Sequence, residues 1–200
     1  MEGKYTKLYR IWHWLMAFSV IGLLGTVFLR KTFLSWHTNS DIIIAKFSEQ
    51  GIVVTEELAK VTAQAIRSGM WEWHYILAVG LGLSMIIRMY MMITKKAEMP
   101  IIYVFKSFKN NDNQGKIKYT VYTILCFFIM AMSISGAIIY FGQDLNMSKD
   151  SIYNVKEIHE NMMNGVIIFV ILHLTGVFKH ELTTKEPIIS KMIHGNDTIS

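Results

Sequence analysis

The chain has 200 residues but only one cysteine, two prolines and few charges. Cys126 has no second cysteine to pair with, which excludes an intramolecular disulfide, and we expect it to serve in packing. Charged residues make up 18% of the sequence, whereas a soluble domain of ordinary composition contains about 25%. With 52% hydrophobic residues and five tryptophans, the composition is typical of a helical membrane protein and not of a disulfide scaffold.

Four segments are apolar over enough residues to cross a membrane, or nearly so, because a span needs about 20 apolar residues. An open chain satisfies its backbone in lipid only as helices, so the expected fold is all-α, an integral membrane four-helix bundle forming a single domain. The expected spans are residues 11–30, 73–94, 119–142 and 156–178. The other expected parts are an outer connection (31–72), an inner connection (95–118) and a cytoplasmic tail (179–200).

Lysine and arginine are distributed unequally between the two sides of the expected membrane. The N-terminal tail, the second connection and the C-terminal tail carry more of them than the first and third connections. This larger group comprises Lys4, Lys7, Arg10, Lys95, Lys96, Lys106, Lys109, Lys116, Lys118, Lys179, Lys185 and Lys191. Because the side richer in these residues faces the cytoplasm, we expect both termini inside. A net charge of +5 would suggest nucleic acid in a soluble protein, but this distribution indicates membrane orientation instead.

The basic N-terminus followed by an apolar segment is also a pattern of secretory signals. Residues 27–30 (Val-Phe-Leu-Arg) offer no small-residue cleavage site. The apolar segment is also long enough to cross the membrane, so we expect it to be retained as the first span.

The outer connection is too long for a simple turn and is expected to be partly helical. Thr55 is a candidate N-cap, with two glutamates in the first turn that suit the helix dipole. Gly69 is the expected end of that helix, and an earlier short helix is expected over residues 41–50. Two interpretations of this connection stay open: a cap lying on the membrane surface, or a docking platform.

Four histidines fall within or at the ends of the expected spans. His13 lies near the cytoplasmic start of the first span, and His74 near the outer start of the second. In the fourth, His159 is outward and His173 inward. Their 14-residue spacing places two rings on one helix face, roughly 21 Å apart. The topology therefore sorts the histidines into depth-matched pairs, His13 with His173 and His74 with His159.

A single histidine in such a place is usually a hydrogen-bonded interfacial residue. Four at matched depths on three helices would require four coincidences, and ionisable groups inside membrane segments are expensive and usually functional. Neutral imidazole is a common ligand of haem iron, and two per iron leave no open coordination position. The pattern therefore predicts two bis-histidine haems that pass electrons, and no catalytic residue.

Two further residues are candidates for cofactor binding. Arg88 follows His74 by 14 residues, on the same face and one leaflet deeper. It either pairs with a propionate of the inner haem or snorkels to the interface. His180 follows His173 by seven residues, closer to the cytosol. It either contacts a propionate or replaces His173 as the ligand.

With Arg-Ile-Trp-His-Trp at residues 10–14 and two histidines 14 apart in the fourth span, the chain resembles the bacterial cytochrome b561 and nickel-iron hydrogenase cytochrome b family. Its tail, with Gly-Val-Phe at 176–178, Glu181 and Ser-Lys-Met-Ile-His-Gly at 190–195, is similar to the ending of the hydrogenase-type branch. The resemblance covers all four spans. It implies a four-helix protein with two haem b groups, whose ligands match His13, His74, His159 and His173.

Members of this family exchange electrons between a quinone pool and a redox partner. The resemblance implies a multi-pass protein of the bacterial inner membrane, an electron-transfer component that depends on a partner for catalysis. The expected partners are membrane lipid, a quinone, a periplasmic redox protein (a c-type cytochrome or a hydrogenase-like subunit) and a second copy of the chain as a homodimer, but not nucleic acid.

Two alternative functions stay open. Some stand-alone members of the family oxidise superoxide, so a self-contained superoxide- or quinone-linked oxidoreductase is the first. The long outer connection of this chain departs from that compact type. The second alternative is a haem-free membrane protein, such as a transporter or an assembly factor.

Overall fold

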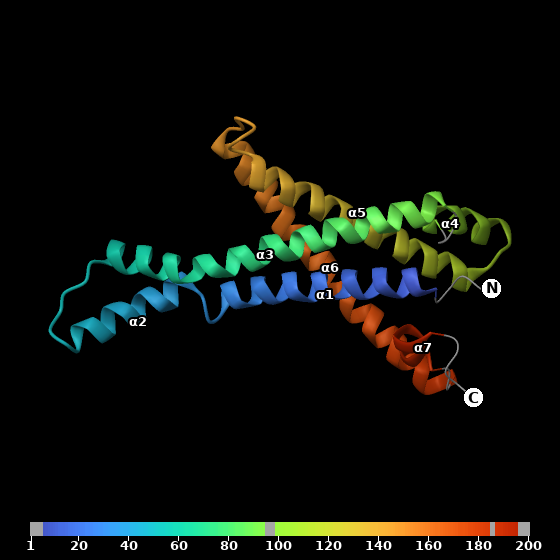
Figure 1. Cartoon of the computed structure of the whole chain (residues 1–200), viewed down its shortest axis with the longest axis horizontal. Helices are drawn as coiled ribbons and strands as arrows, with labels where there is room; N and C mark the ends of the chain where they lie inside the picture. Colours follow the sequence, from blue (N-terminus) through green and yellow to red (C-terminus); the bar gives the residue numbers. More distant parts are fainter. Residues whose placement is uncertain (1–5, 95–98, 185–186, 196–200) are drawn as a thin grey trace. The chain divides into compact units, whose positions relative to one another are not determined.

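The computed structural model describes residues 6–94, 99–184 and 187–195, which form helices joined by short connections (Figure 1). The helices of these ranges are α1 (Lys7–Lys31), α2 (Trp36–Ser48), α3 (Glu56–Ile93), α4 (Pro100–Lys109), α5 (Asn113–Phe141), α6 (Lys149–Thr184) and α7 (Ile188–His194). Four of the lysines from which the membrane orientation was predicted lie outside the described residues: Lys4, Lys95, Lys96 and Lys185.

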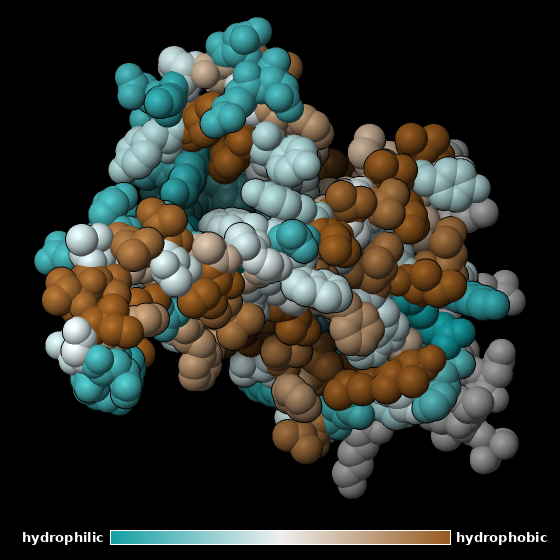
Figure 2. All heavy atoms as spheres, turned by 60° about the vertical axis from the view of Figure 1, so that its left-hand side comes forward, coloured by the Kyte–Doolittle hydropathy of each residue, from teal (hydrophilic) through white to brown (hydrophobic). Residues whose placement is uncertain are grey.

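Helices α1, α3, α5 and α6 are long and apolar enough to cross a membrane by length and composition, which confirms the predicted all-helical fold with four spans. Large hydrophobic side chains are exposed along them: Phe18 is 66% exposed, Val79 63% and Ile168 58%. Figure 2 shows hydrophobic side chains over much of the face that it presents. Such a surface suits lipid, which would cover these side chains.

The connection between α1 and α3 is partly helical, as predicted, but its helices differ in their bounds. α2 begins at Trp36 and ends at Ser48, earlier than the expected 41–50. α3 begins at Glu56, directly after Thr55, whose hydroxyl accepts a hydrogen bond from the Leu58 N–H at 3.3 Å. The prediction that this helix ends at Gly69 is wrong, because α3 continues to Ile93. A glycine inside a helix costs only about 1 kcal/mol, which the long flanking segments offset.

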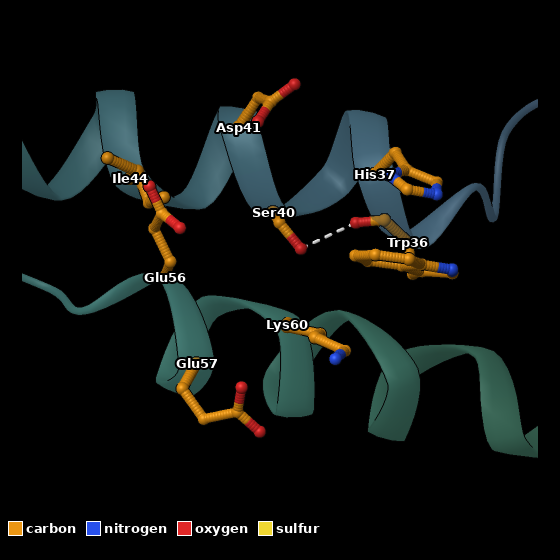
Figure 3. A pocket seen from close by; sticks show the side chains of 8 residues that line it. All are labelled: Trp36, His37, Ser40, Asp41, Ile44, Glu56, Glu57 and Lys60. Atoms are coloured by element: carbon orange, nitrogen blue, oxygen red, sulfur yellow. Dashed lines mark hydrogen bonds between the residues drawn. The ribbon is translucent and has the colours of Figure 1, made fainter.

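The chain divides into two compact units, residues 15–81 and residues 1–14 with 82–200. In the first unit, α1 and α3 approach closely, since a Cβ added at Gly80 would lie 2.8 Å from the Ser19 hydroxyl oxygen. α2 runs beside the first turns of α3 (Figures 1 and 3), where the Lys60 ammonium lies 5.4 Å from the centre of the Trp36 ring. The first connection therefore consists of a structured pair of helices, α2 and the first turns of α3.

In the second unit, α5 packs against both α4 and α6. Asp112 caps the start of α5 by accepting a hydrogen bond from the Gly115 N–H at 3.0 Å. α5 and α6 cross closely at Gly165, where an added Cβ would lie 2.9 Å from Cε1 of Phe128. This crossing fixes how α6 lies against α5, and therefore how the histidines of α6 meet α5.

The short helix α7 is held to the start of α1, in the same unit. The Arg10 guanidinium donates to the Ile193 carbonyl at 2.7 Å, and the Trp14 indole N–H donates to the Met192 carbonyl at 3.2 Å. These side chains donate to carbonyls in the last turn of α7, for which the helix itself offers no N–H donor. α7 is thus held beside the turn of α1 that carries His13.

The close crossing of α5 and α6 is testable with two glycine substitutions. Gly165→Ala should lower the stability of the detergent-purified protein by about 1–3 kcal/mol, because the added methyl group overpacks against Phe128. The matched control is Gly69→Ala, where no described atom lies within 4 Å of the added Cβ. It should stabilise α3 by up to about 1 kcal/mol through helix propensity. Thermal unfolding measures both, and equal melting temperatures for the two variants would contradict the assignment.

Candidate functional site

His13 on α1 and His173 on α6 face each other, with ring centroids 6.1 Å apart. Both are half-buried. Phe169 lies one helical turn before His173 and stacks on it, with a centroid distance of 5.7 Å and an interplanar angle of 14°. Trp14 contacts His13 edge-on at 5.7 Å. Aromatic neighbours therefore restrict the orientation of both imidazoles.

A buried cation lies over Trp12, the residue directly before His13. The Arg88 guanidinium of α3 sits over the Trp12 ring at 4.9 Å, and Trp12 directly precedes His13. Arg88 is 9% exposed and Trp12 is 7% exposed. Within the described part of the chain, the buried indole nitrogen of Trp12 has no hydrogen-bond acceptor. A cation next to an unsatisfied N–H donor suits a carboxylate ligand.

His74 belongs to the other unit and is held by α1. Its Nδ1 lies 2.7 Å from the hydroxyl oxygen of Thr26, and Trp71 contacts the ring edge-on at 5.6 Å. The Arg30 guanidinium lies 5.8 Å from the centre of the Trp71 ring. One imidazole nitrogen of His74, Nδ1, is thus engaged by a hydroxyl group of α1.

His159 of α6 is held by α5 in the same manner. Its Nδ1 lies 2.8 Å from the hydroxyl oxygen of Ser135. The next residue, Gly136, permits this approach, because an added Cβ there would lie 3.3 Å from Cε1 of His159. Nδ1 of His159 is thus engaged by a hydroxyl group of α5.

α6 is continuous from Lys149 to Thr184, so His159 and His173 lie on one face of a single helix, roughly 21 Å apart along its axis. The structure brings His13 and His173 together. His74 and His159 lie in different units, so their pairing stays a prediction, as does the role of the exposed His180. His37 stacks on Trp36 in α2, with ring centroids 3.5 Å apart.

Three groups of the site were not predicted from the sequence: the hydroxyls of Thr26 and Ser135 and the indole N–H of Trp12. A hydroxyl side chain inside an apolar span is the sequence feature that could have indicated Thr26 and Ser135. It is a weak indication, because Thr123 and Ser133 also lie in α5 and, among the described residues, bond only to carbonyls of their own helix.

Comparison with protein families identifies this architecture. The family model described as prokaryotic cytochrome b561 matches residues 4–195, nearly the whole chain. The chain belongs to the prokaryotic cytochrome b561 family. Searches of curated proteins and of solved structures gave no match.

Family membership makes this protein a multi-pass membrane cytochrome of the b type, and it implies haem b and a role in electron transport. The residues fit that cofactor. His13 and His173, whose ring centroids lie 6.1 Å apart, would supply imidazole nitrogens to the iron of one haem. Arg88 and the Trp12 N–H supply a cation and a donor for the propionate carboxylates that haem carries.

Proposed function

We propose that this cytochrome holds two bis-histidine haem b groups and transfers electrons between a periplasmic redox protein and the quinone pool. His13 and His173 would hold the inner haem, and His74 and His159 the outer one. The 6.1 Å separation of His13 and His173 is the observation that carries the proposal. When bound, a bis-histidine haem b takes up and releases one electron and leaves no coordination position open.

The protein supplies ligation, burial and spacing. α6 would contribute one ligand to each haem, and its rise separates these two ligands, His159 and His173, by roughly 21 Å. Arg88 and Trp12 would bind a propionate of the inner haem, because a buried guanidinium and an indole N–H both suit a carboxylate. His180, two turns after His173 on α6, is proposed as a second propionate contact.

The proposed orientation places both termini in the cytoplasm and the whole chain in one membrane domain. The lysine and arginine distribution supports this orientation. It puts α2 and the first turns of α3 outside, where they would receive the redox partner. A pocket of about 330 Å³ lies between these two helices, lined by charged and aromatic side chains including Trp36, Asp41, Glu57 and Lys60 (Figure 3). The family suggests association with hydrogenase or other redox partners.

Haem content tests the proposal directly. The purified protein should contain two haems per chain, with the reduced spectrum of a b-type cytochrome. His13→Ala, His173→Ala, His74→Ala and His159→Ala should each remove about one haem, because a single imidazole holds the iron weakly. His37→Ala is the control and should keep both.

Double variants separate the pairs. His13→Ala with His173→Ala should remove one haem in total, whereas His13→Ala with His74→Ala should remove both. The reverse result would refute the pairing. A purified wild-type protein without haem would refute the function and favour a transporter or assembly factor.

Arg88 is expected to raise the midpoint potential of the inner haem, because a nearby cation favours the reduced form. Arg88→Gln should lower one of the two potentials, by about 59 mV for each tenfold change in the redox equilibrium. Arg88→Lys, which retains the charge, should restore most of the shift. Arg67→Gln, on the same helix outside the apolar segment, is the control. Spectroelectrochemical titration measures both haems, and unchanged potentials in Arg88→Gln would exclude this role.

The outer helices are expected to bind the redox partner. Asp41→Lys with Glu57→Lys should abolish co-purification of a haem- or hydrogenase-containing protein from native membranes, because the charge of the pocket rim reverses. Lys109→Glu on α4 is the matched control at the other side of the membrane and should leave the partner bound. Superoxide-driven haem reduction by the isolated protein, with no partner retained, would favour the stand-alone oxidoreductase instead.

A further inference from the structure

The two faces of the short helix α4 differ in their surroundings. Ser107 is 5% exposed and lies toward α5, where a Cβ added at Gly115 would lie 2.5 Å from the Ser107 hydroxyl oxygen. On the other side, Ile101, Phe105 and Phe108 recur at helical spacing and are 53%, 70% and 62% exposed. α4 therefore carries an apolar stripe, formed by these three residues, that the described part of the chain leaves exposed.

Contacts between α4 and α5 show that the two helices run antiparallel (Figure 1). Ser107 meets Gly115, and the ring of Tyr103, one turn earlier in α4, lies 5.0 Å from that of Tyr119, one turn later in α5. Tyr119 begins a segment of α5, residues 119–141, that contains no charged side chain. The first turn of α4 therefore lies level with the apolar part of α5, and its last turn lies level with the lysines of α5.

Two lysines lie at the boundary between the charged and the apolar part of this helix pair. The Lys106 ammonium lies 5.5 Å from the centre of the Tyr103 ring, and the Lys118 ammonium lies 5.2 Å from the centre of the Tyr119 ring. Because the two tyrosine rings contact each other, both ammonium groups lie over one aromatic pair. The two helices thus bring two positive charges together at one level.

Lys116 adds a third charge beside the apolar stripe. Its ammonium lies 5.2 Å from the centre of the Phe108 ring and donates to the side-chain oxygens of Asn111 and Asn113. Within the described residues, none of the three lysines pairs with a carboxylate. Residues 99–127 contain a single carboxylate, Asp112, which caps α5. The positive charge of this helix pair is therefore not neutralised by its own side chains.

We propose that α4 and the first turns of α5 bind anionic phospholipids of the membrane. Acyl chains contact the apolar stripe, and lipid phosphates bind Lys106, Lys116 and Lys118. A helix with basic residues beside an apolar face lies at the boundary between headgroups and acyl chains. Lysines at that level attract anionic lipids, and neighbouring charges add to the attraction. This role does not depend on haem binding and goes beyond the proposed electron transfer.

The position of the stripe beside a membrane span identifies lipid as its occupant. α5 is long and apolar enough to cross a membrane, and α4 packs against its basic end. An apolar stripe at that level meets acyl chains, and ammonium groups at the same level meet phosphates. A soluble polyanion would match the three lysines but would leave the stripe in water.

Native mass spectrometry of the detergent-purified full-length protein tests the lipid preference. Dioleoyl phosphatidylglycerol should bind in preference to dioleoyl phosphatidylcholine. Lys106→Gln, Lys116→Gln and Lys118→Gln should each weaken phosphatidylglycerol binding by about fivefold, and the corresponding arginine variants should retain it. Inorganic phosphate in excess should not displace the lipid, because it lacks acyl chains.

The matched control removes two exposed lysines from the first turns of α6. Lys149→Gln with Lys156→Gln should leave phosphatidylglycerol binding unchanged, because Asp150 and Glu157 directly follow these lysines and offset their charge. The double variant Lys106→Gln with Lys118→Gln has the same change in net charge and should weaken binding strongly. The comparison therefore separates a local site from an effect of total charge.

Cysteine labelling in phosphatidylglycerol nanodiscs tests the placement of the stripe. In a Cys126→Ser background, Ile101→Cys and Phe105→Cys should react with a charged maleimide about tenfold more slowly than Asn110→Cys, because the acyl region excludes the reagent. Asn110 directly follows α4 and is exposed. In detergent-free native membranes the same order of reactivity is expected.

Each outcome supports or overturns the proposal. Equal binding of the two lipids, or equal weakening in the α6 control, would overturn the anionic-lipid site. Displacement by inorganic phosphate would indicate a soluble anion instead. Equal labelling of the three cysteines in nanodiscs would overturn the placement in the membrane, and protection only in native membranes would show that a protein covers the stripe. Preferential binding of phosphatidylglycerol by a protein without haem would support the lipid site and refute the proposed function alone.

Discussion

Polar groups inside an apolar bundle need partners, and this constraint determines most of what the structure shows. The backbone of the four spans satisfies it as helix. Thr26 and Ser135 satisfy it by hydrogen bonding both to carbonyls of their own helices and to a histidine. The same hydroxyls engage Nδ1 of His74 and Nδ1 of His159. Hydroxyl groups buried in the spans therefore restrict the orientation of both imidazoles.

Close helix contacts give these polar groups their geometry. Gly136 lets α5 approach the His159 ring, and Gly165 lets Phe128 pack against α6. α6 itself is continuous over both histidine positions, so a rigid element sets their separation. The precision of the site therefore depends on small residues and uninterrupted helices more than on any single hydrogen bond. A cofactor that must keep a fixed distance from a second one requires this type of scaffold.

The fold could be predicted from the sequence because many residues contribute to each of its features. The length of the apolar segments predicted the four spans. The rise of a helix predicted the separation of His159 and His173 along α6. Features decided by one local contact were harder. Gly69 has the character of a helix end, yet α3 continues through it because the segments on both sides are helical. The partners of His74 and His159 depend on the rotation of each helix about its axis. Hydroxyls such as Ser133 and Ser135 differ in sequence position by only two residues, but only Ser135 reaches a histidine.

In the proposed arrangement the inner site depends on residues that are already held in place. Trp14 and Phe169 contact the rings of His13 and His173 and restrict their orientation. Arg88 lies buried over the Trp12 ring. None of these contacts needs a conformational change, because all of the residues lie in helices. The orientation of the inner histidines would thus be a property of the membrane bundle itself, whereas the partner at the outer helices would determine which electrons enter.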